Sequence, residues 1–591
     1  MEGNSPVTDE RTDDYETDVL VIGGGFAGSW AALRAAALGA RVILVDKAYV
    51  SRSGASTMSG GITTCPLDTD DLDVWAEEFI THGSYMCDQR WTYQLLEGQR
   101  ARIKDYESWG VPISRDADGQ IRRFASRGMI TVRGMQYQPK VAMRELRRRA
   151  LEHGVTILDR VCITELTTSD GCWPTDGSVI GAVGFNVHGG QFVHIRAKRT
   201  IVATGMIAMK GTHRVDNDTG DGVAMAYRVG ARLVDMEFTF GGTFNVLMKR
   251  FDFPSYNVAI AHGARLINAK GERFMEKIDP VRLERGELPH VVAAFAKQLL
   301  DGNGPVYIDL RHVDDTYWPD MAKIHRGGTI LLSDHVPDPR VHPLPIEPTW
   351  GMWASGRSGL QIDLNGRTNI PGLFAAGSAA KNDATGTHAS AGSPTAFCNV
   401  SGWHAGECAA RESLEDQQAP TPAGMIEALR SATFAPLTKA PHPKTPDLLH
   451  DDLAKLEASV VDGMVLSGPR LEAMLAVTQE VAGLTEEIAA ADLHDLVKLH
   501  EARNVSECAA AVYRSALDRT ESRDQFFRED HPMTDPSWFC WHGIRRGANG
   551  VIMERLPFPL EGVRFPIKND QSGLGPIGAI ILGGKPEQGD A

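Results

Sequence analysis

The sequence contains no run of about 18 apolar residues, so no segment is predicted to cross a membrane as a helix. It also lacks the basic and apolar stretches of a signal peptide, because it begins with the acidic and polar MEGNSPVTDERTDDYETD. The sequence has fewer basic than acidic residues: it contains 61 Lys and Arg and 76 Asp and Glu, which gives a formal net charge of −15. That charge argues against nucleic acid as a partner, since phosphate binding needs a basic surface. We expect a cytoplasmic protein without a transmembrane segment.

Closely spaced cysteines are missing as well. The eight cysteines lie at positions 65, 87, 162, 172, 398, 408, 508 and 540, with no Cys-x-x-Cys pair. Zinc sites and iron–sulfur clusters normally need closer ligands, and a disulfide framework would be unusual in a chain of 591 residues. We therefore expect reduced, mostly buried thiols and no metal site, so that any iron–sulfur cluster would lie on another subunit.

A nucleotide-binding βαβ unit is predicted at 17–47, where the sequence reads TDVLVIGGGFAGSWAALRAAALGARVILVDK. An apolar strand is followed by a glycine turn, an alanine-rich helix and a second apolar strand that ends at Asp46. The pattern of Gly23, Gly25 and Gly28 permits a tight turn, close approach of the backbone to a pyrophosphate and close helix–strand packing. The helix N-terminus offers N–H groups to phosphate, and Asp46 can bind a ribose hydroxyl. These features predict a bound dinucleotide.

The loop after the second strand favours a flavin over a nicotinamide dinucleotide. It reads SRSGASTMSGGI at 51–62, and such small residues suit a backbone that contacts the phosphate, ribityl chain and ring of FAD. Two distant apolar strands that end in glycine, RTIVATG at 199–205 and GLFAAG at 372–377, are assigned to the same domain. Insertions interrupt that domain, and no clear second dinucleotide fingerprint for NAD(P)H is present.

These motifs together resemble a known superfamily, the flavoprotein subunits of succinate dehydrogenase, fumarate reductase, L-aspartate oxidase and adenylylsulfate reductase. Eight motifs follow the family's order: VLVIGGGFAG, SGAS…SGGI, VATG, NDTGDGVAMAYRVGA (217–231), DMEF (235–238), GERFMEK (271–277), GLFAAG and ESRDQFFREDHPMTDPSW (521–538). The resemblance covers residue 17 to about 540. In pattern, the adenylylsulfate reductase flavoprotein (alpha) subunit is the most similar member, through RSGA, GFAGSWAA and DLHDLVKLHEARN.

The resemblance implies an α/β fold: a Rossmann-like FAD-binding domain, an inserted α+β cap domain and a C-terminal helical domain. The expected division is a disordered acidic tail (1–16), the FAD-binding domain in two parts (17–245 and 356–412), the cap (246–355), a connection (413–449), the helical domain (450–525) and a C-terminal extension of strands and loops (526–591).

The resemblance also implies which residues hold FAD. Those expected at the AMP half and pyrophosphate are Gly23, Gly25, Phe26, Ala27, Gly28, Asp46 and Lys47. Those expected at the pyrophosphate and flavin ring are Ser53, Gly54, Ala55, Ser59, Gly60 and Gly61. Ala203, Thr204, Gly205 and Asp221 are expected on the adenine and ribityl side, and Gly377, Ser378, Ser393, Pro394 and Thr395 next to the flavin. The family has an acid at Ser378, so the ribityl contact is expected to be weaker or remade by Asn382 or Asp383.

Two departures from the family bear on the chemistry. In succinate dehydrogenases a histidine that is covalently joined to the flavin occupies the position of Gly54, so we expect non-covalent FAD. The positions that bind dicarboxylates in the family are also changed, to Gly242, to Leu288 or Pro289, to Ser390, and to a residue near Trp350. Because a dicarboxylate needs bidentate cationic clamps, succinate, fumarate and aspartate are not the expected substrates. An asparagine that binds adenylylsulfate, expected near Thr64 or Cys65, is missing as well.

Four residues remain as candidates for proton transfer or substrate polarisation. His388 lies on the segment that approaches the flavin, and His262, Arg265 and Arg285 belong to the expected cap. The alternatives are a histidine bonded within its own loop and arginines that are solvated or structural. Arg523 and Arg528 match the family's ESR…R pattern, for which we favour an ion-paired junction between the helical domain and the rest of the chain.

The predicted function is that of a soluble FAD-dependent oxidoreductase that binds a small-molecule substrate between the FAD-binding and cap domains. The resemblance implies electron exchange with a ferredoxin-like iron–sulfur subunit. One alternative is an enzyme like fumarate reductase or aspartate oxidase, which reacts with a small acid or oxygen. Another is an FAD-bearing electron-transfer partner without a substrate of its own.

Overall fold

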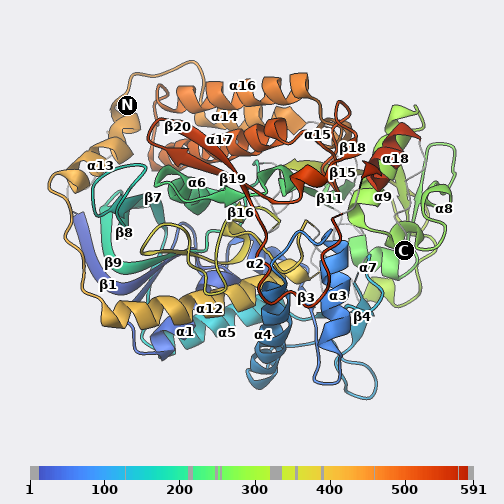
Figure 1. The fold of residues 1–591 in the computed structure, drawn as a ribbon, viewed down its shortest axis with the longest axis horizontal. Helices are drawn as coiled ribbons and strands as arrows, with labels where there is room; N and C mark the ends of the chain where they lie inside the picture. Colours follow the sequence, from blue (N-terminus) through green and yellow to red (C-terminus); the bar gives the residue numbers. More distant parts are fainter. Residues whose placement is uncertain are drawn as a thin grey trace.

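The computed structural model describes residues 12–126, 128–210, 217–246, 251–252, 256–319, 336–352, 357–387, 392–457, 459–569 and 572–583. Figure 1 shows the elements of the Rossmann-like domain, the cap and the C-terminal helices in one view. Within the described residues, no helix is long and apolar enough to cross a membrane.

A seven-stranded sheet forms the centre of the Rossmann-like domain. Its strands are, in spatial order, β6 (Thr156–Asp159), β2 (Val42–Asp46), β1 (Thr12–Ile22), β9 (Phe192–Val202), β8 (Val179–Asn186) and β7 (Val161–Thr168), and β17 (Leu373–Ala375) also pairs with β9. The pairs β1–β2, β1–β9, β2–β6 and β9–β17 are parallel. The apolar runs of β1 and β2 are buried, as is typical of parallel strands covered on both faces. The predicted α/β class is confirmed, and the distant strands β9 and β17 lie in one sheet, as expected of strands of one domain.

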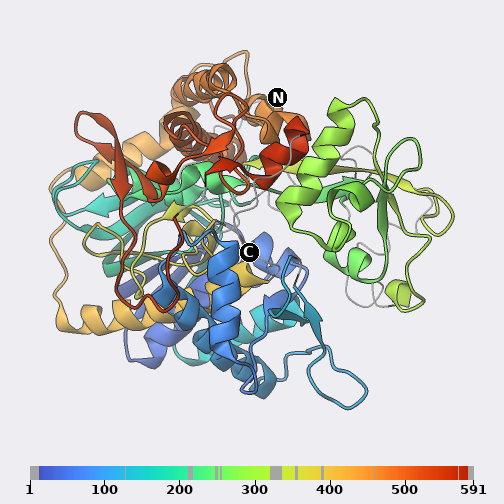
Figure 2. The same ribbon diagram turned by 45° about the vertical axis from the view of Figure 1, so that its right-hand side comes forward.

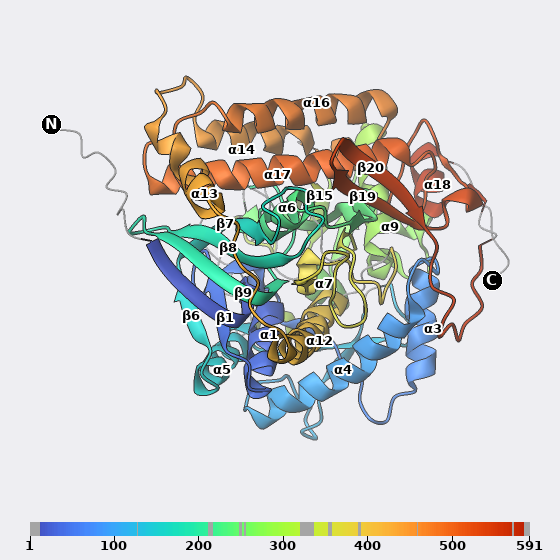
Figure 3. The ribbon, with the colours of Figure 1, turned by 60° about the vertical axis from the view of Figure 1, so that its left-hand side comes forward.

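Helices cover both faces of this sheet (Figure 3). On one face, α1 (Phe26–Ala37) packs against α12 (Ser393–Glu415) and α5 (Pro139–Glu152). A Cβ on Gly402 would lie 2.2 Å from the carbonyl oxygen of Ala27, and one on Gly406 would lie 2.3 Å from that of Ala31. Glycines on α12 thus let it approach α1 closely and place its N-terminus beside the glycine turn.

The first strand begins earlier than expected. Residues 12–16, assigned from their acidity to a disordered tail, form the start of β1 and pair in parallel with β9 from Phe192 to Arg196. The carboxylate of Asp14 lies 2.9 Å from Nδ1 of His194, and Glu16 pairs with Arg196 at 2.5 Å. The acidic composition therefore reflects side chains that face basic partners on the next strand, and the prediction of disorder is wrong for these five residues. Residues 1–11 lie outside the described part of the chain.

The cap contains a five-stranded antiparallel sheet and lies beside the Rossmann-like domain in Figure 2. Its strands are β12 (Phe251–Asp252), β11 (Phe240–Val246), β15 (Leu344–Met352), β14 (Tyr307–Asp309) and β13 (Arg265–Ile267). Its main helices are α7 (Tyr256–Ala261), α8 (Met275–Ile278) and α9 (Leu288–Leu300). β11 begins six residues before the expected boundary at 246.

The C-terminal part of the chain is more helical than expected. The predicted helical domain contains α14 (Pro446–Ala454), α15 (Val460–Met464), α16 (Gly468–Thr485) and α17 (Leu493–Asp518), and α13 (Met425–Phe434) lies in the segment expected to be a connection. The extension forms the hairpin of β19 (Trp541–Gly547) and β20 (Gly550–Leu556). It ends in α18 (Pro576–Leu582), which was not predicted and packs on α9 of the cap. The cap therefore contacts the C-terminal extension.

Candidate functional site

One cavity opens where the carboxyl ends of β1, β2 and β9 meet the first turns of α1, α6 (Asp221–Arg228) and α12. It contains about 1180 Å³ of empty space, including its open mouth. Crevices at the carboxyl ends of parallel strands are the usual nucleotide sites of such folds. We call this the nucleotide cavity.

Most of the expected cofactor residues line the nucleotide cavity. They are Gly23, Gly25, Phe26, Ala27, Asp46, Lys47, Ser53, Gly54, Ala55, Ser59, Ala203, Thr204, Gly205, Asp221, Ser378, Pro394 and Thr395. The expected residues that do not line it are Gly28, Gly60, Gly61, Gly377 and Ser393. Three of these five are glycines that permit close packing. An added Cβ on Gly28 would lie 1.8 Å from the carbonyl oxygen of Gly23, and one on Gly61 would lie 2.1 Å from that of Tyr137. One on Gly377 would lie 2.6 Å from Cβ of Ala27.

The glycine turn is shaped for a bulky anion. Gly23 has a φ of +104°, and a Cβ there would lie 2.4 Å from the oxygen of Ala203, so only glycine fits. At Gly25 a Cβ would meet nothing within 4 Å except the Ser56 side chain, with Oγ at 3.0 Å. Gly25 therefore leaves open the space in front of the first turn of α1, where backbone N–H groups and the helix dipole favour phosphate.

Asp46 orders this turn from the end of β2. Its two carboxyl oxygens accept hydrogen bonds from the backbone N–H groups of Gly24 and Ala48, each at 2.8 Å. Burial raises the pKa of Asp46, and these two bonds oppose the shift. The side chain thus connects the glycine turn to the following loop while it faces the cavity.

Lys47 lines the cavity, but its ammonium group is already engaged. It donates to Thr219 Oγ1 at 2.8 Å, to Asp221 Oδ2 at 2.8 Å and to Glu501 Oε1 at 2.7 Å. Burial lowers its pKa, but the carboxylates of Asp221 and Glu501 outweigh burial and raise it. Lys47 therefore neutralises acids beside the cavity and links β2 to α17 of the helical domain.

Neither residue expected to replace the acid missing at Ser378 lines the cavity. Asp383 accepts from Trp541 Nε1 at 3.1 Å and pairs with Lys381 at 3.2 Å. Burial raises the pKa of Asp383 to about 6. Asn382 is buried outside the cavity as well, which leaves a weaker ribityl contact as the expectation of the two that agrees with the lining. Trp541 of the C-terminal extension thus donates a hydrogen bond to the carboxylate of Asp383.

Several lining residues were not predicted from the sequence. They are Ile22, Gly24, Val45, Ala48, Ser56, Val161, Cys162, Ile163, Met206, Asn217, Asp218, Met225 and Cys398. Ser56 lies in the small-residue loop that had been identified, and its Oγ accepts the N–H of Phe26 at 3.0 Å. Asp218 had a signal too, since it precedes Asp221 in the NDTGDG motif. Cys162 and Met225 reach the cavity through packing that no sequence motif indicates.

None of the described candidates for proton transfer lines the nucleotide cavity. His262 bonds Asp314 through Nδ1 at 2.9 Å, and Thr316 together with His262 lowers the pKa of Asp314 to about 2. Arg265 is half-buried on β13, and Arg285 is exposed. His262 is thus held by residues of the cap. His388 lies outside the described residues.

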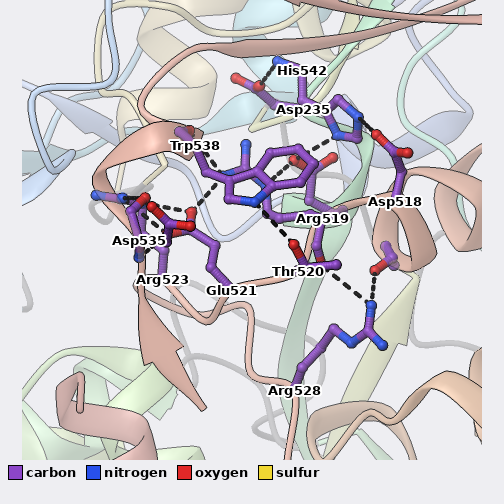
Figure 4. Close-up of polar contacts among 12 residues, drawn as sticks. Asp235, Asp518, Arg519, Thr520, Glu521, Arg523, Arg528, Asp535, Trp538 and His542 are labelled. Carbon is purple, nitrogen blue, oxygen red and sulfur yellow. Dashed lines mark hydrogen bonds and ion pairs between the residues drawn. The ribbon is translucent and has the colours of Figure 1, made fainter. Parts of the chain in front are cut away.

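Arg523 and Arg528 connect the helical domain with the C-terminal extension through hydrogen bonds to carbonyl groups, whereas their ion pairs, predicted to make the junction, are local (Figure 4). Arg523 pairs with Glu521 at 2.9 Å and donates to the carbonyl of Asp535. Arg528 pairs with Asp530 at 2.7 Å. Its Nη1 also donates to carbonyl groups at the end of α17, those of Ala516, Leu517 and Arg519. The junction thus satisfies helix carbonyls that would otherwise lack partners.

Next to this junction, His542 is buried between two carboxylates. It lies 3.2 Å from Glu237 and 2.9 Å from Asp518. Burial lowers its pKa, but the Glu237 carboxylate and the Asp518 hydrogen bond outweigh burial and raise the pKa to about 9. His542 is therefore expected to carry a proton at neutral pH and to connect the C-terminal extension with η1 (Met236–Thr239) and the end of α17.

This charge makes a pH-dependent contribution to stability. Since the folded pKa is raised from 6.5 to about 9, the contribution is complete below pH 6.5 and is lost as the pH rises to about 9. We expect the thermal midpoint of the wild type to fall toward that of His542→Gln across this window, as read by circular dichroism. Parallel midpoint curves for the two proteins between pH 6.5 and 9 would contradict the assignment.

Two family models match the chain. Residues 18–395 match the model described as FAD binding domain, and residues 470–571 match the one described as fumarate reductase flavoprotein C-term. Among characterised relatives, a fumarate reductase (CoM/CoB) chain of Methanothermobacter marburgensis is 29% identical over 560 residues, covering 89% of this chain and 96% of the relative. L-aspartate oxidase of Streptomyces coelicolor is 28% identical over 561 residues, covering 90% and 91%.

Solved structures share the fold over nearly the whole chain. A quinol fumarate reductase flavoprotein of E. coli superposes with a TM-score of 0.83 at 22% identity, covering 95% of this chain and 99% of its own. Adenylylsulfate reductase of Archaeoglobus fulgidus superposes with a TM-score of 0.77 at 22% identity, covering 93% and 97%. The arrangement of Rossmann-like domain, cap and C-terminal helices is therefore common to these proteins and this chain.

Proposed function

This chain belongs to the FAD binding domain family, within the flavoproteins of the succinate dehydrogenase and fumarate reductase superfamily, and we propose that it is an FAD-dependent oxidoreductase with a small-molecule substrate bound between the Rossmann-like domain and the cap. The observation that carries the proposal is the nucleotide cavity, in which the open space before Gly25 lies next to Asp46 and the small-residue loop. These residues fit a dinucleotide with a diphosphate and polyhydroxyl chains.

Bound FAD would supply the group that accepts or donates electrons. The chain's own residues would bind and orient it: the turn at Gly23 and Gly25 receives the diphosphate, and Asp46 offers carboxyl oxygens to hydroxyl groups. Ser378, Pro394 and Thr395, at the start of α12 and the loop before it, lie on the other side of the cavity. The cap would exclude water from the reacting atoms.

We further propose that FAD is held without a covalent bond. Gly54 lines the cavity with a φ of +73°, so the residue at this position offers no nucleophile. Two thiols also line the cavity, but burial raises the pKa of Cys398 to about 11 and that of Cys162 further, so both stay protonated. We expect acid or heat to release all FAD into the supernatant. Flavin fluorescence that stays with the denatured chain on a gel would contradict this.

The substrate is proposed to differ from succinate, fumarate and aspartate, although some relatives are named for fumarate or aspartate. α9 of the cap begins with Leu288 and Pro289, which cannot bind a carboxylate by charge. Gly242, at a further changed position, and Trp350, near another, are cross-strand partners in the cap sheet. Ser390, at the fourth position, lies outside the described residues.

Stopped-flow absorbance of the flavin tests this proposal. We expect succinate not to bleach the oxidised holoenzyme and fumarate not to reoxidise the dithionite-reduced one, because a dicarboxylate would lose its charged contacts in the cleft. Dithionite followed by ferricyanide is the positive control for an active flavin. Turnover with either acid at more than about 1 s⁻¹, the lower end of ordinary enzyme rates, would overturn the proposal.

Electrons are proposed to pass to or from a ferredoxin-like iron–sulfur subunit, since the scattered cysteines of this chain are poor cluster ligands. Purification of the native complex, with iron and acid-labile sulfide analysis, tests this. Release of hydrogen peroxide by the isolated chain would instead favour the oxidase alternative. A flavin that dithionite reduces but that no metabolite in a broad screen reduces would favour an electron-transfer partner without a substrate.

A further inference from the structure

Three acidic side chains line the nucleotide cavity, where a dianionic diphosphate is expected. They are Asp46, Asp218 and Asp221, and Lys47 is the one cation among the described lining residues. Lys47 already pairs with Asp221 at 2.8 Å and with Glu501 at 2.7 Å. Apart from the N–H groups at the first turn of α1, the cavity therefore has little free positive charge for three ionised acids and a diphosphate together.

Two of the three acids have hydrogen-bond partners for both of their carboxyl oxygens. Asp221 accepts hydrogen bonds from Lys47, from Thr219 Oγ1 at 2.8 Å and from Asn504 Nδ2 at 3.0 Å. Burial raises its pKa, but Lys47, Thr219 and Asn504 outweigh burial and lower it. Asp46 uses both oxygens to accept backbone N–H groups, which oppose the rise that burial causes in its pKa. Neither acid needs a proton from outside to satisfy its hydrogen bonds.

Asp218 differs from the other two. It is 5% exposed, and its Oδ2 has no hydrogen-bond partner among the described residues. Its Oδ1 lies against the backbone of Gly205, where an added Cβ would be only 2.8 Å away. A buried oxygen without a partner costs free energy unless a ligand supplies the contact.

The charges around Asp218 favour its neutral form. Burial raises its pKa to about 7, with Asp221 and Asp46 adding to the shift and Lys47 and the N–H of Met206 opposing it. Across the cavity, Cys398 is a neutral thiol next to Ser378, at 3.9 Å between Sγ and Oγ. Glu501, behind Lys47, adds a further negative charge that Lys210 shares. No described cation faces Asp218 other than Lys47.

We propose that Asp218 binds FAD as a neutral carboxylic acid, donating its proton to an oxygen of the cofactor, so that FAD binding takes up one proton from solvent above neutral pH. The unpartnered Oδ2 supplies the hydrogen-bonding position, and the diphosphate supplies the negative charge that holds the proton there. Asp218 thereby makes cofactor retention depend on pH. The inference depends on the FAD cofactor and not on the substrate.

The sign of the pH dependence follows from linkage. The complex is expected to hold the proton to a higher pH than the chain without FAD does. Above the lower of the two pKa values, binding must take up a proton, so the association constant for FAD falls by about tenfold per pH unit until the higher value is reached. FAD should therefore be retained at pH 6 to 7 and released progressively above that range.

Dilution of the holoenzyme tests the proposal directly. Wild-type protein is diluted into buffers from pH 6 to 9, and free FAD is read from its fluorescence. We expect the dissociation constant to rise by about tenfold per unit above pH 7, whereas Asp218→Asn, which mimics the neutral acid, is expected to show a nearly flat profile. Asp383→Asn is the matched control, because Asp383 is also a buried acid with a raised pKa but does not line the cavity, and it should keep the wild-type slope.

Calorimetry of wild-type reconstitution provides a measurement that needs no variant. Apoprotein is titrated with FAD at pH 8 in buffers of different ionisation enthalpy, and about one proton taken up per FAD is expected. A flat wild-type profile, uptake near zero, or an Asp218→Asn protein that keeps the wild-type slope would each overturn the proposal. None of these outcomes involves a substrate, so each leaves the proposed oxidoreductase function standing.

Discussion

Replacing Gly25 by valine is expected to give a folded chain that purifies without FAD. The φ of Gly25 is −72°, which valine can adopt, and the added side chain would meet only Ser56 before it enters the cavity. There it would occupy the space in front of the first turn of α1 that the diphosphate needs. Overpacking of this kind costs about 3 kcal/mol, which corresponds to a loss of affinity of about a hundredfold. The ratio of absorbance at 450 nm, about the flavin maximum, to that at 280 nm measures the loss.

Gly28→Val is the matched comparison, because it changes the same motif in a different way. Its Cβ would lie 1.8 Å from the carbonyl oxygen of Gly23 and 3.3 Å from Cβ of Ala203, so it would separate α1 from the sheet. We therefore expect Gly28→Val to lose the fold, with a lower thermal midpoint or insoluble protein, whereas Gly25→Val keeps the wild-type circular dichroism. A Gly25→Val protein that purifies yellow with full flavin would overturn the assignment of the turn.

The sequence predicted the central sheet because its signals are local. β1, α1 and β2 follow one another within 17–47, and each apolar run is long enough to identify its element. The assignment of β9 and β17 to one domain also held, because the two strands pair in parallel. The start of β1 was missed because its stability depends on His194 and Arg196, which lie far along the chain. α18 was missed because its apolar face is covered by the cap helix α9.

The cavity was predicted well where backbone geometry determines it, and less well where distant charges do. Gly23, Gly25 and Asp46 belong to one motif and lie together as that motif requires. Lys47, in contrast, bonds Glu501, which is 454 positions away in the sequence. No local pattern reports that contact, and the sequence placed Lys47 only among the residues expected at the AMP half and pyrophosphate. The same shortage of free positive charge leaves Oδ2 of Asp218 without a hydrogen-bond partner among the described residues.

Removing the guanidinium of Arg519 is expected to be among the most destabilising single changes in this chain. Arg519 is fully buried and pairs with Glu237 at 2.5 Å and with Glu521 at 2.6 Å (Figure 4). Its guanidinium also lies 5.0 Å from the ring centre of Phe238 and 5.1 Å from that of Trp538. In Arg519→Met two buried carboxylates would lose this partner, which costs about 3–5 kcal/mol. The shift of the urea midpoint, followed by tryptophan fluorescence, measures the loss.

A double variant separates the charge from the packing. If the cost comes from the uncompensated carboxylate, Arg519→Met combined with Glu237→Gln should recover part of the loss, because a neutral amide is cheaper to bury than an unpaired charge. In the wild type, His542 and Arg519 together hold the pKa of Glu237 at about 2 against the opposing effect of burial, and in the single variant His542 alone would remain beside it. Glu521 would also lose Arg519, but it would keep its ion pair with Arg523 at 2.9 Å. A double variant less stable than Arg519→Met alone would assign the loss to packing around Trp538 and Phe238 instead of to charge.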